Sequence, residues 1–182
     1  MSKLFVDEIQ PKTTGGTVTL HEGSIVKMLY TQFDGTNSYV FVANTDLVVT
    51  DLTVTITPTS ATSKFRLEGQ VYGEWSNRDS TWDGTVFFFR DTTKLAHPTA
   101  LSRNCGVGSM FLSHESDSSS TGEGSAMFQY FDAPNTTSSI TYKVGIRTDA
   151  VRTFYLNRTV SDTDAANYER FVSSICVTEI KG

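Results

Sequence analysis

The hydrophobic pattern of this chain is clearest over Leu52–Thr57, where apolar and polar residues alternate. In an extended segment this alternation places the apolar side chains on one face and the threonines on the other. Pro58 ends the strand, because proline cannot donate to a sheet ladder. A turn over Thr59–Ser63 follows, and Phe65 and Leu67 resume the inward face. The pattern therefore predicts a β-hairpin with a loop of about five residues.

From residue 25 onward the chain is a series of short apolar or alternating runs separated by Gly, Asn, Asp, Ser and Pro. This spacing is typical of a sandwich or a barrel, and helical periodicity is nearly absent. Further strands are predicted at Ile25–Phe33, Ser38–Ala43, Thr85–Arg90, Gly106–Leu112, Ala126–Phe131, Ile140–Arg147, Thr153–Asn157 and Phe171–Ile180. We therefore predict an all-β fold, an antiparallel jelly-roll-like β-sandwich of about nine or ten strands that forms a knob-like domain over residues 25–182.

Residues 1–24 differ from the rest and predict an extended N-terminal arm. Phe5, Val6 and Ile9 form a short apolar group, and Pro11 with Thr13–Gly16 then breaks any regular element. An extended apolar segment can add a strand to the sheet edge of a partner or fill its groove, so these residues are expected to attach the chain to other proteins. The alternative is an edge strand within the same chain.

Two segments depart from the alternating pattern. Val86–Phe89 is apolar without alternation, so both of its faces must be covered, either by two layers of one subunit or by a neighbouring subunit. Phe87, Phe88 and Phe89 are therefore predicted subunit-interface residues. Asp162–Arg170 predicts a single helical turn capped by Asp162 or Asp164.

Composition and charge exclude several classes of function. The net charge of −5 and the pI near 5.1 argue against binding nucleic acid through bulk electrostatics. No run approaches the roughly 20 apolar residues of a membrane-spanning helix. The first ten residues carry acids where a signal peptide would be apolar, so we expect neither membrane insertion nor secretion by that route. Cys105 and Cys176 show no zinc-ligand spacing and are expected to be small buried hydrophobic residues.

The chemical motifs point to no enzyme, cofactor or metal. The nearest matches to a serine nucleophile elbow, at residues 106–110 and 122–126, have the wrong register, and no phosphate-binding glycine loop is complete. The segment containing Asp162, Asp164 and Glu169 resembles a calcium loop without the required spacing, so we interpret it as a solvated loop. Paired carboxylates for glycoside cleavage remain open, because they meet only in space. Asn135 and Asn157 begin N-glycosylation acceptor sequences.

Residues 74–84 contain both tryptophans beside hydrogen-bonding side chains, which suggests a sugar-binding loop. Aromatic faces stack on sugar rings, and planar polar groups bond their hydroxyls. The predicted receptor contacts are Trp75, Asn77, Arg78, Asp79 and Trp82. The alternative interpretation is that Trp75 packs in the core and Trp82 covers a sheet edge.

Several segments taken together resemble virion structural and tail-fibre proteins of marine tailed bacteriophages, especially cyanophages. The segments that carry this resemblance are Lys3–Gly16, Leu52–Lys64 with its "sITP-x-s-x-SK" pattern, Phe89–Asp91, Tyr130–Thr137, Thr141–Val144, Tyr155–Arg158 and Val177–Ile180. Each is a weak motif alone, but together they follow one another in order along most of the chain.

The resemblance implies a virion component with a jelly-roll-like sandwich, commonly a homotrimer at fibre tips, and no enzymatic activity. It favours a short tail fibre or fibre-tip component that helps the particle adhere to its host, located on the tail more than on the capsid. Its partners would be other virion proteins, through the N-terminal arm, and a host surface glycan. The alternatives are a capsid fibre or decoration protein without receptor binding and, further away, a polysaccharide depolymerase. The chain has no repetitive shaft, unlike long fibres.

Overall fold

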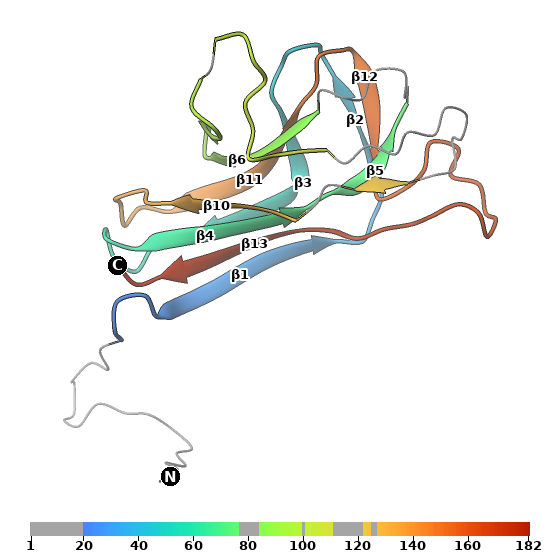
Figure 1. The fold of residues 1–182 in the computed structure, drawn as a ribbon. Helices are drawn as coiled ribbons and strands as arrows, with labels where there is room; N and C mark the ends of the chain where they lie inside the picture. Colours follow the sequence, from blue (N-terminus) through green and yellow to red (C-terminus); the bar gives the residue numbers. More distant parts are fainter. Residues whose placement is uncertain (1–19, 77–83, 100, 111–121, 125–126) are drawn as a thin grey trace, which may run out of the picture.

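The computed structural model describes residues 20–76, 84–99, 101–110, 122–124 and 127–182, and within these ranges the chain is all-β (Figure 1). The described residues contain no helix, and so none that is long and apolar enough to span a bilayer. Of the predicted arm, residues 20–24 are described, and Gly23 and Ser24 exchange backbone hydrogen bonds with Lys181. Phe5, Val6 and Ile9 lie outside the described residues.

Within the described ranges thirteen strands form three antiparallel sheets. Their bounds are β1 Ile25–Phe33, β2 Asn37–Phe41, β3 Leu47–Ile56, β4 Lys64–Gln70, β5 Tyr72–Trp75, β6 Thr85–Arg90, β7 Thr93–Leu95, β8 Gly108–Ser109, β9 Glu123–Gly124, β10 Phe128–Asp132, β11 Ile140–Arg147, β12 Arg152–Leu156 and β13 Ser173–Ile180. The β1 sheet has the order β1-β13-β4-β10, the β2 sheet β2-β12-β5-β9, and the β3 sheet β3-β11-β6-β7 with β8 also on β6. Apart from β6, β7 and β8, which share one sheet, successive strands pass from sheet to sheet, and the fold is the predicted jelly-roll-like sandwich.

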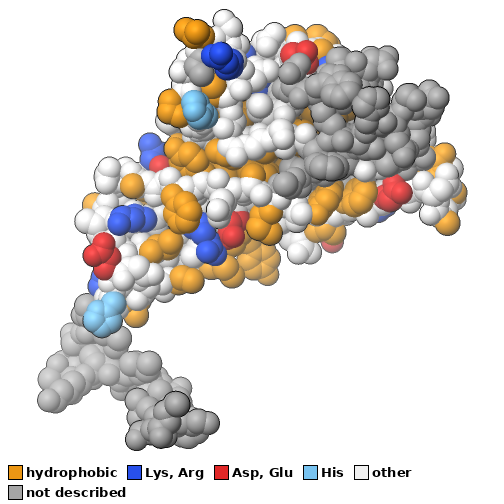
Figure 2. Space-filling view, in the orientation of Figure 1, with side chains coloured by type: hydrophobic (Ala, Val, Ile, Leu, Met, Phe, Trp, Pro, Cys, Tyr) orange, Lys and Arg blue, Asp and Glu red, His pale blue; other side chains and the backbone are white. Residues whose placement is uncertain are grey.

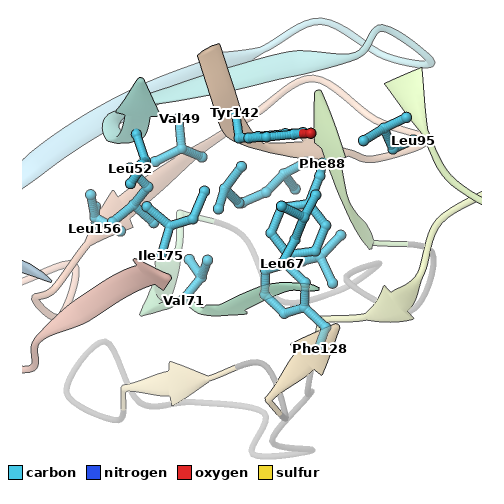
Figure 3. Packing of buried hydrophobic residues seen from close by; sticks show 14 of the residues in the cluster. Val49, Leu52, Leu67, Val71, Phe88, Leu95, Phe128, Tyr142, Leu156 and Ile175 are labelled. Atoms are coloured by element: carbon cyan, nitrogen blue, oxygen red, sulfur yellow. The ribbon is translucent and has the colours of Figure 1, made fainter. Parts of the chain in front are cut away.

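One continuous hydrophobic core lies between the β1 sheet and the β3 sheet and extends to the β2 sheet through Phe41, Trp75 and Phe154. Leu67 on β4 and Ile175 on β13 enter it from one side, and Leu52 on β3 and Phe88 on β6 enter it from the other (Figure 3). Phe88 and Phe128 pack with ring centroids 5.0 Å apart. The alternating apolar positions of the sequence are therefore the inward faces of two packed sheets.

The predicted hairpin at Leu52–Leu67 is wrong in its pairing. Both strands exist, but β3 pairs with β11 and β4 pairs with β13 and β10. Their alternation correctly identified the inward faces, and these faces meet across the sandwich instead of lying side by side in one sheet. The segment from Pro58 to Ser63 is thus a corner between two sheets.

Two smaller sequence predictions are also wrong. Asp162–Arg170 forms no helical turn: it contains an isolated turn in which Tyr168 N donates to Ala165 O, and Arg170 pairs with Asp162 at 2.7 Å. Cys105 and Cys176 are partly exposed and not buried. Cys176 lies on the outward side of β13, where alternation directs every second side chain away from the core.

The run Val86–Phe89 is covered within a single chain. Phe88 points into the core, and Phe87 points to the opposite side of the β3 sheet, yet both are fully buried. Lys94 Nζ lies 3.8 Å from the centroid of the Phe87 ring, and Phe89 packs edge-on to it at 5.4 Å. The paired residue on β11 is Gly145, where a Cβ atom would lie 2.3 Å from the ring. Phe87 and Phe88 are therefore not subunit-interface residues, and Phe89 is half-buried.

Three buried polar groups join the sheets to one another. The first is Glu179 on β13, whose Oε1 accepts hydrogen bonds from Thr59 N at 2.6 Å, Thr59 Oγ1 at 2.7 Å and Ser63 Oγ at 2.7 Å. Its Oε2 lies 3.5 Å from Lys27 Nζ. Burial alone would raise the pKa of this carboxyl, but the hydrogen bonds and the lysine outweigh it and lower the pKa. Glu179 thus holds the corner between β3 and β4.

The second joint connects β10, β6 and β11. Arg90 Nη1 donates to Asp132 Oδ1 at 2.9 Å and Oδ2 at 3.0 Å, and the Tyr142 hydroxyl donates to Oδ2 at 2.8 Å. Burial raises the pKa of Tyr142, and the hydrogen bond to the Asp132 carboxylate raises it further. Because Asp132 belongs to the β1 sheet and its two partners to the β3 sheet, this cluster ties the two layers together.

The third joint is Asn157, directly after β12. Its backbone is in the left-handed region, with φ of 59°, and its side chain is fully buried. Asn157 Nδ2 donates to Phe33 O at 2.7 Å and Gly35 O at 2.9 Å, and its Oδ1 accepts from Ser173 Oγ at 2.6 Å. The side-chain amide therefore joins the end of β1 to the start of β13.

Candidate functional site

The candidate site is a polar cleft beneath the loop that connects β7 to β8. This loop leaves the β3 sheet after Leu95 and returns at Val107, whose N–H donates to Val86 O at 2.8 Å. It projects at the upper left of Figure 1, where it is yellow-green, and basic, histidine and hydrophobic side chains gather on it in Figure 2. A backbone hydrogen bond between its two sides, from His97 N to Gly106 O at 3.2 Å, and a contact from Cys105 Sγ to Pro98 O at 3.6 Å keep the loop closed near its base.

The cleft has a volume of about 450 Å³. Part of its lining comes from the framework: Asp46 just before β3, Lys94 on β7 and Arg147 at the end of β11. The remainder comes from the loop, including His97 and Arg103. The sheet therefore fixes one side of the cleft, and the loop supplies the other.

An ion-pair network holds the framework side in place. Asp46 Oδ1 accepts from Lys94 Nζ at 2.9 Å and from Arg147 Nη1 at 3.3 Å. Arg147 Nε donates to Asn104 Oδ1 at 2.7 Å, which connects the framework to the loop. The side chains of Lys94, Arg147 and Asp46 are each about one quarter exposed.

The loop presents a strained residue at the mouth of the cleft. Leu101 has a φ of 58°, a backbone conformation that costs an L-residue other than Gly or Asn roughly 1–2 kcal/mol. Its side chain is 88% exposed, so core packing does not compensate for this strain. Backbone strain at an exposed apolar residue is a feature of binding loops more than of structural turns.

The lining is suited to holding an anion, since three cationic side chains, Lys94, Arg103 and Arg147, stand against the single carboxylate of Asp46. This local excess of positive charge contrasts with the net charge of −5 of the chain. Among the described residues no three His, Cys, Asp or Glu side chains gather as metal ligands. Asp162 is paired with Arg170, and Glu169 Oε2 accepts from Gly122 N at 3.1 Å.

The structure separates Trp75 from the predicted receptor-binding loop. Trp75 is 1% exposed and packs against Phe41 and Phe154 with ring centroids 5.0 and 4.9 Å away. Arg152 lies 5.7 Å from its ring. The prediction of a receptor contact at Trp75 is therefore wrong, because strand alternation directs this ring into the core. The other predicted contacts, Asn77, Arg78, Asp79 and Trp82, lie outside the described residues.

A second surface of interest is the outward side of the β1 sheet. Register places Tyr30, Cys176, Glu68 and Gln129 in one row across the four strands. The neighbouring row is Met28, Thr178, Arg66 and Phe131. Tyr30 and Phe131 are 67% and 61% exposed, and Arg66 pairs with Glu68 at 3.1 Å. Over these strands Figure 2 shows hydrophobic side chains interspersed with charges of both signs.

Sequence reasoning missed the cleft entirely. Asp46, Lys94 and Arg147 are far apart along the chain, and none belongs to a motif. They meet because β7 and β11 both flank β6, while the segment before β3 reaches the same end of the sheet. A pairing prediction for these strands would have been needed to find the site.

Comparison with known proteins adds little to this description. No protein-family model matches the chain, and no curated protein matches it by sequence. Among solved structures, the VP2 subviral particle of infectious bursal disease virus is similar, with a TM-score of 0.37 and 9% identity. The match covers 87% of this chain and 39% of the VP2 chain. At this level the likeness carries no argument about function.

Proposed function

We propose that this chain is a non-enzymatic structural protein of a bacteriophage particle, a short tail fibre or fibre-tip component that helps the particle adhere to its host. The observation that carries the proposal is where the sequence segments that resemble phage fibre proteins lie in the fold. All of them but Lys3–Gly16, which is outside the described residues, meet at the three buried polar joints.

Leu52–Lys64 and Val177–Ile180 come together at the Glu179 joint. Phe89–Asp91, Tyr130–Thr137 and Thr141–Val144 come together at the Asp132 joint. Tyr155–Arg158 contains the Asn157 joint. Residues that depend on one another in space are expected to recur as a set, and this expectation supports the proposal that these segments form one sandwich framework.

The same observation limits what the resemblance implies. Glu179, Asp132 and Asn157 are buried, so they account for the fold and leave the contact with the host unspecified. The proposed adhesion to the host must therefore depend on residues at the surface of the protein. The cleft under the loop from β7 to β8 is the described feature best suited to it.

We also propose that the chain assembles as a homotrimer through the outward side of the β1 sheet. Tyr30, Met28 and Phe131 supply exposed apolar area, and Arg66 and Glu68 supply both charge signs within the same patch. In a three-fold ring one part of the patch contacts a different part of the neighbour's patch, and a patch with both charge signs lets Arg66 of one chain face Glu68 of the next. The fibre-like resemblance favours three copies.

Location on the particle tests the main proposal. Mass spectrometry of purified virions should detect the chain, and gold-labelled antibodies against it should decorate the tail. Labelling of the capsid shell would favour the alternative of a decoration protein, and absence from the particle would refute a virion role. Release of reducing sugars from host polysaccharide by the purified protein would revive the depolymerase alternative.

A further inference from the structure

We propose that the cleft formed by Asp46, Lys94, Arg147 and the loop from β7 to β8 binds a sugar unit that carries a carboxylate. This inference rests on the proposed role in host adhesion, because it names the chemistry that the particle would recognise. The volume of about 450 Å³ falls within the range of about 300–1,000 Å³ typical of small-molecule sites.

The first argument is the availability of donors. Lys94 Nζ donates one of its three N–H bonds to Asp46 Oδ1 and lies 3.8 Å from the centroid of the Phe87 ring, which leaves a third N–H bond for a ligand. Arg147 uses Nε and Nη1, and its Nη2 makes no hydrogen bond to the described part of the chain. Both cations are thus oriented by Asp46 and Asn104 while keeping donors for a ligand. A guanidinium group suits the planar, bidentate geometry of a carboxylate.

The second argument is that Asp46 serves as a positioning group. Without it, two cations so close together would repel each other and take up varied conformations. With it, the charges of Lys94 and Arg147 converge on one carboxylate oxygen. A bound carboxylate would therefore meet cations that are already ordered, which reduces the entropic cost of binding.

The third argument concerns the sugar part of the ligand. Thr99 and Ser102 bring hydroxyl groups to the lining, and Leu101 stands at the mouth with its strained backbone and exposed side chain. Sugars combine hydroxyl groups with apolar C–H faces, so a site with adjacent hydroxyl and aliphatic groups is complementary to them. A simple inorganic anion would make no use of Leu101.

The experiment measures binding of sodium D-glucuronate to the full-length protein by two-dimensional amide NMR. We expect saturable shifts at residues of the cleft, weakened by added salt because the contact is between charges. Glucose, which has the same ring without the carboxylate, should bind at least about tenfold more weakly. Equal binding of glucose, equal binding of inorganic phosphate, or no shift with glucuronate would each overturn the proposal.

Two variants and a control sharpen the result. Lys94→Gln should weaken glucuronate binding by about tenfold, the effect of losing one charge-assisted hydrogen bond. Leu101→Gly should also weaken it while leaving the fold intact, since this side chain is exposed. Arg170→Gln makes the same change of charge at a surface residue paired with Asp162, outside the cleft, and should bind like wild type. Unchanged binding by both cleft variants would refute the assignment.

Failure here is distinguishable from failure of the proposed function. If the chain is found in purified virions but does not bind glucuronate, only the ligand assignment is wrong. If it is absent from virions, the adhesive role is wrong whatever the cleft binds.

Discussion

The outward sides of the two main sheets carry similar aromatic residues, but the chain treats them differently. On the β3 sheet Phe87 is fully buried, because Lys94 and Phe89 cover it. On the β1 sheet Tyr30 and Phe131 remain largely exposed. The apolar run Val86–Phe89 was predicted to lie at a subunit interface because it does not alternate. Its second face is instead covered by the same chain. The exposed aromatics lie instead on strands whose pattern alternates imperfectly.

The largest expected effect is at the covered aromatic residue. Phe87→Ala should lower the free energy of unfolding by about 3–5 kcal/mol, the usual cost of removing a fully buried aromatic ring. It should leave the oligomeric state unchanged. Urea unfolding and light scattering measure the two quantities. A loss below about 1 kcal/mol would mean that the side chain is not buried as described.

Substitution of the exposed aromatic residues should change the oligomeric state more than the free energy of unfolding. Replacing Tyr30 and Phe131 together by Glu should convert the assembly to single chains, because like charges would then face each other across the interface. The stability of each chain should change little, and light scattering gives the mass. Val40→Glu is the matched control, as Val40 is 67% exposed on β2 of another sheet. Dissociation by the control as well would locate the interface elsewhere.

The contribution of Glu179, at the corner between β3 and β4, to the free energy of unfolding should depend on pH. The pKa of Glu179 is lowered from its ordinary value of 4.5, so its contribution to stability is complete above that value and is lost as the pH falls through the folded-state pKa. Glu179→Gln should cost about 1–3 kcal/mol at pH 7. The difference from wild type should shrink below pH 4.5. Urea unfolding at several pH values measures it, and a constant difference would contradict this assignment.

The smallest expected change in the free energy of unfolding concerns Leu101, in the loop from β7 to β8. Leu101→Gly should raise the free energy of unfolding by up to about 1 kcal/mol, because glycine adopts a positive φ without strain. Thermal unfolding followed by circular dichroism should show a slightly higher midpoint. Combined with weaker glucuronate binding, this outcome would mean that the strain is kept for ligand contact. A destabilised variant would instead assign Leu101 a structural role.

The sequence was most informative about individual strands. Ile25–Phe33, Thr85–Arg90 and Ile140–Arg147 have the predicted bounds, because turn residues flank each apolar run. Alternation also identified the inward side chains of β3 and β4 correctly. It could not identify which strands pair, since a period of two specifies a face and leaves the neighbour open. The hairpin prediction failed for this reason.

The candidate site was harder to predict than the fold. Trp75 looked like a ligand-binding residue because polar residues follow it, but its place at the end of β5 decides its orientation. The cleft depends on Asp46, Lys94 and Arg147, which come together only through the strand order β3-β11-β6-β7. The negative net charge also gave no indication of the cleft, because a chain that is acidic overall can still contain a cleft lined by basic side chains.

The buried amide of Asn157 has a consequence for how the protein can be produced. Asn157 begins the acceptor sequence Asn157-Arg158-Thr159, and its Nδ2 is the atom to which a eukaryotic oligosaccharyltransferase would attach a glycan. In the folded chain that nitrogen donates to Phe33 O and Gly35 O. A glycan added during translocation would block both bonds and leave the carbonyl groups after the end of β1 without this partner. Bacterial expression, or Thr159→Ala in a secreting host, avoids this competition between modification and folding.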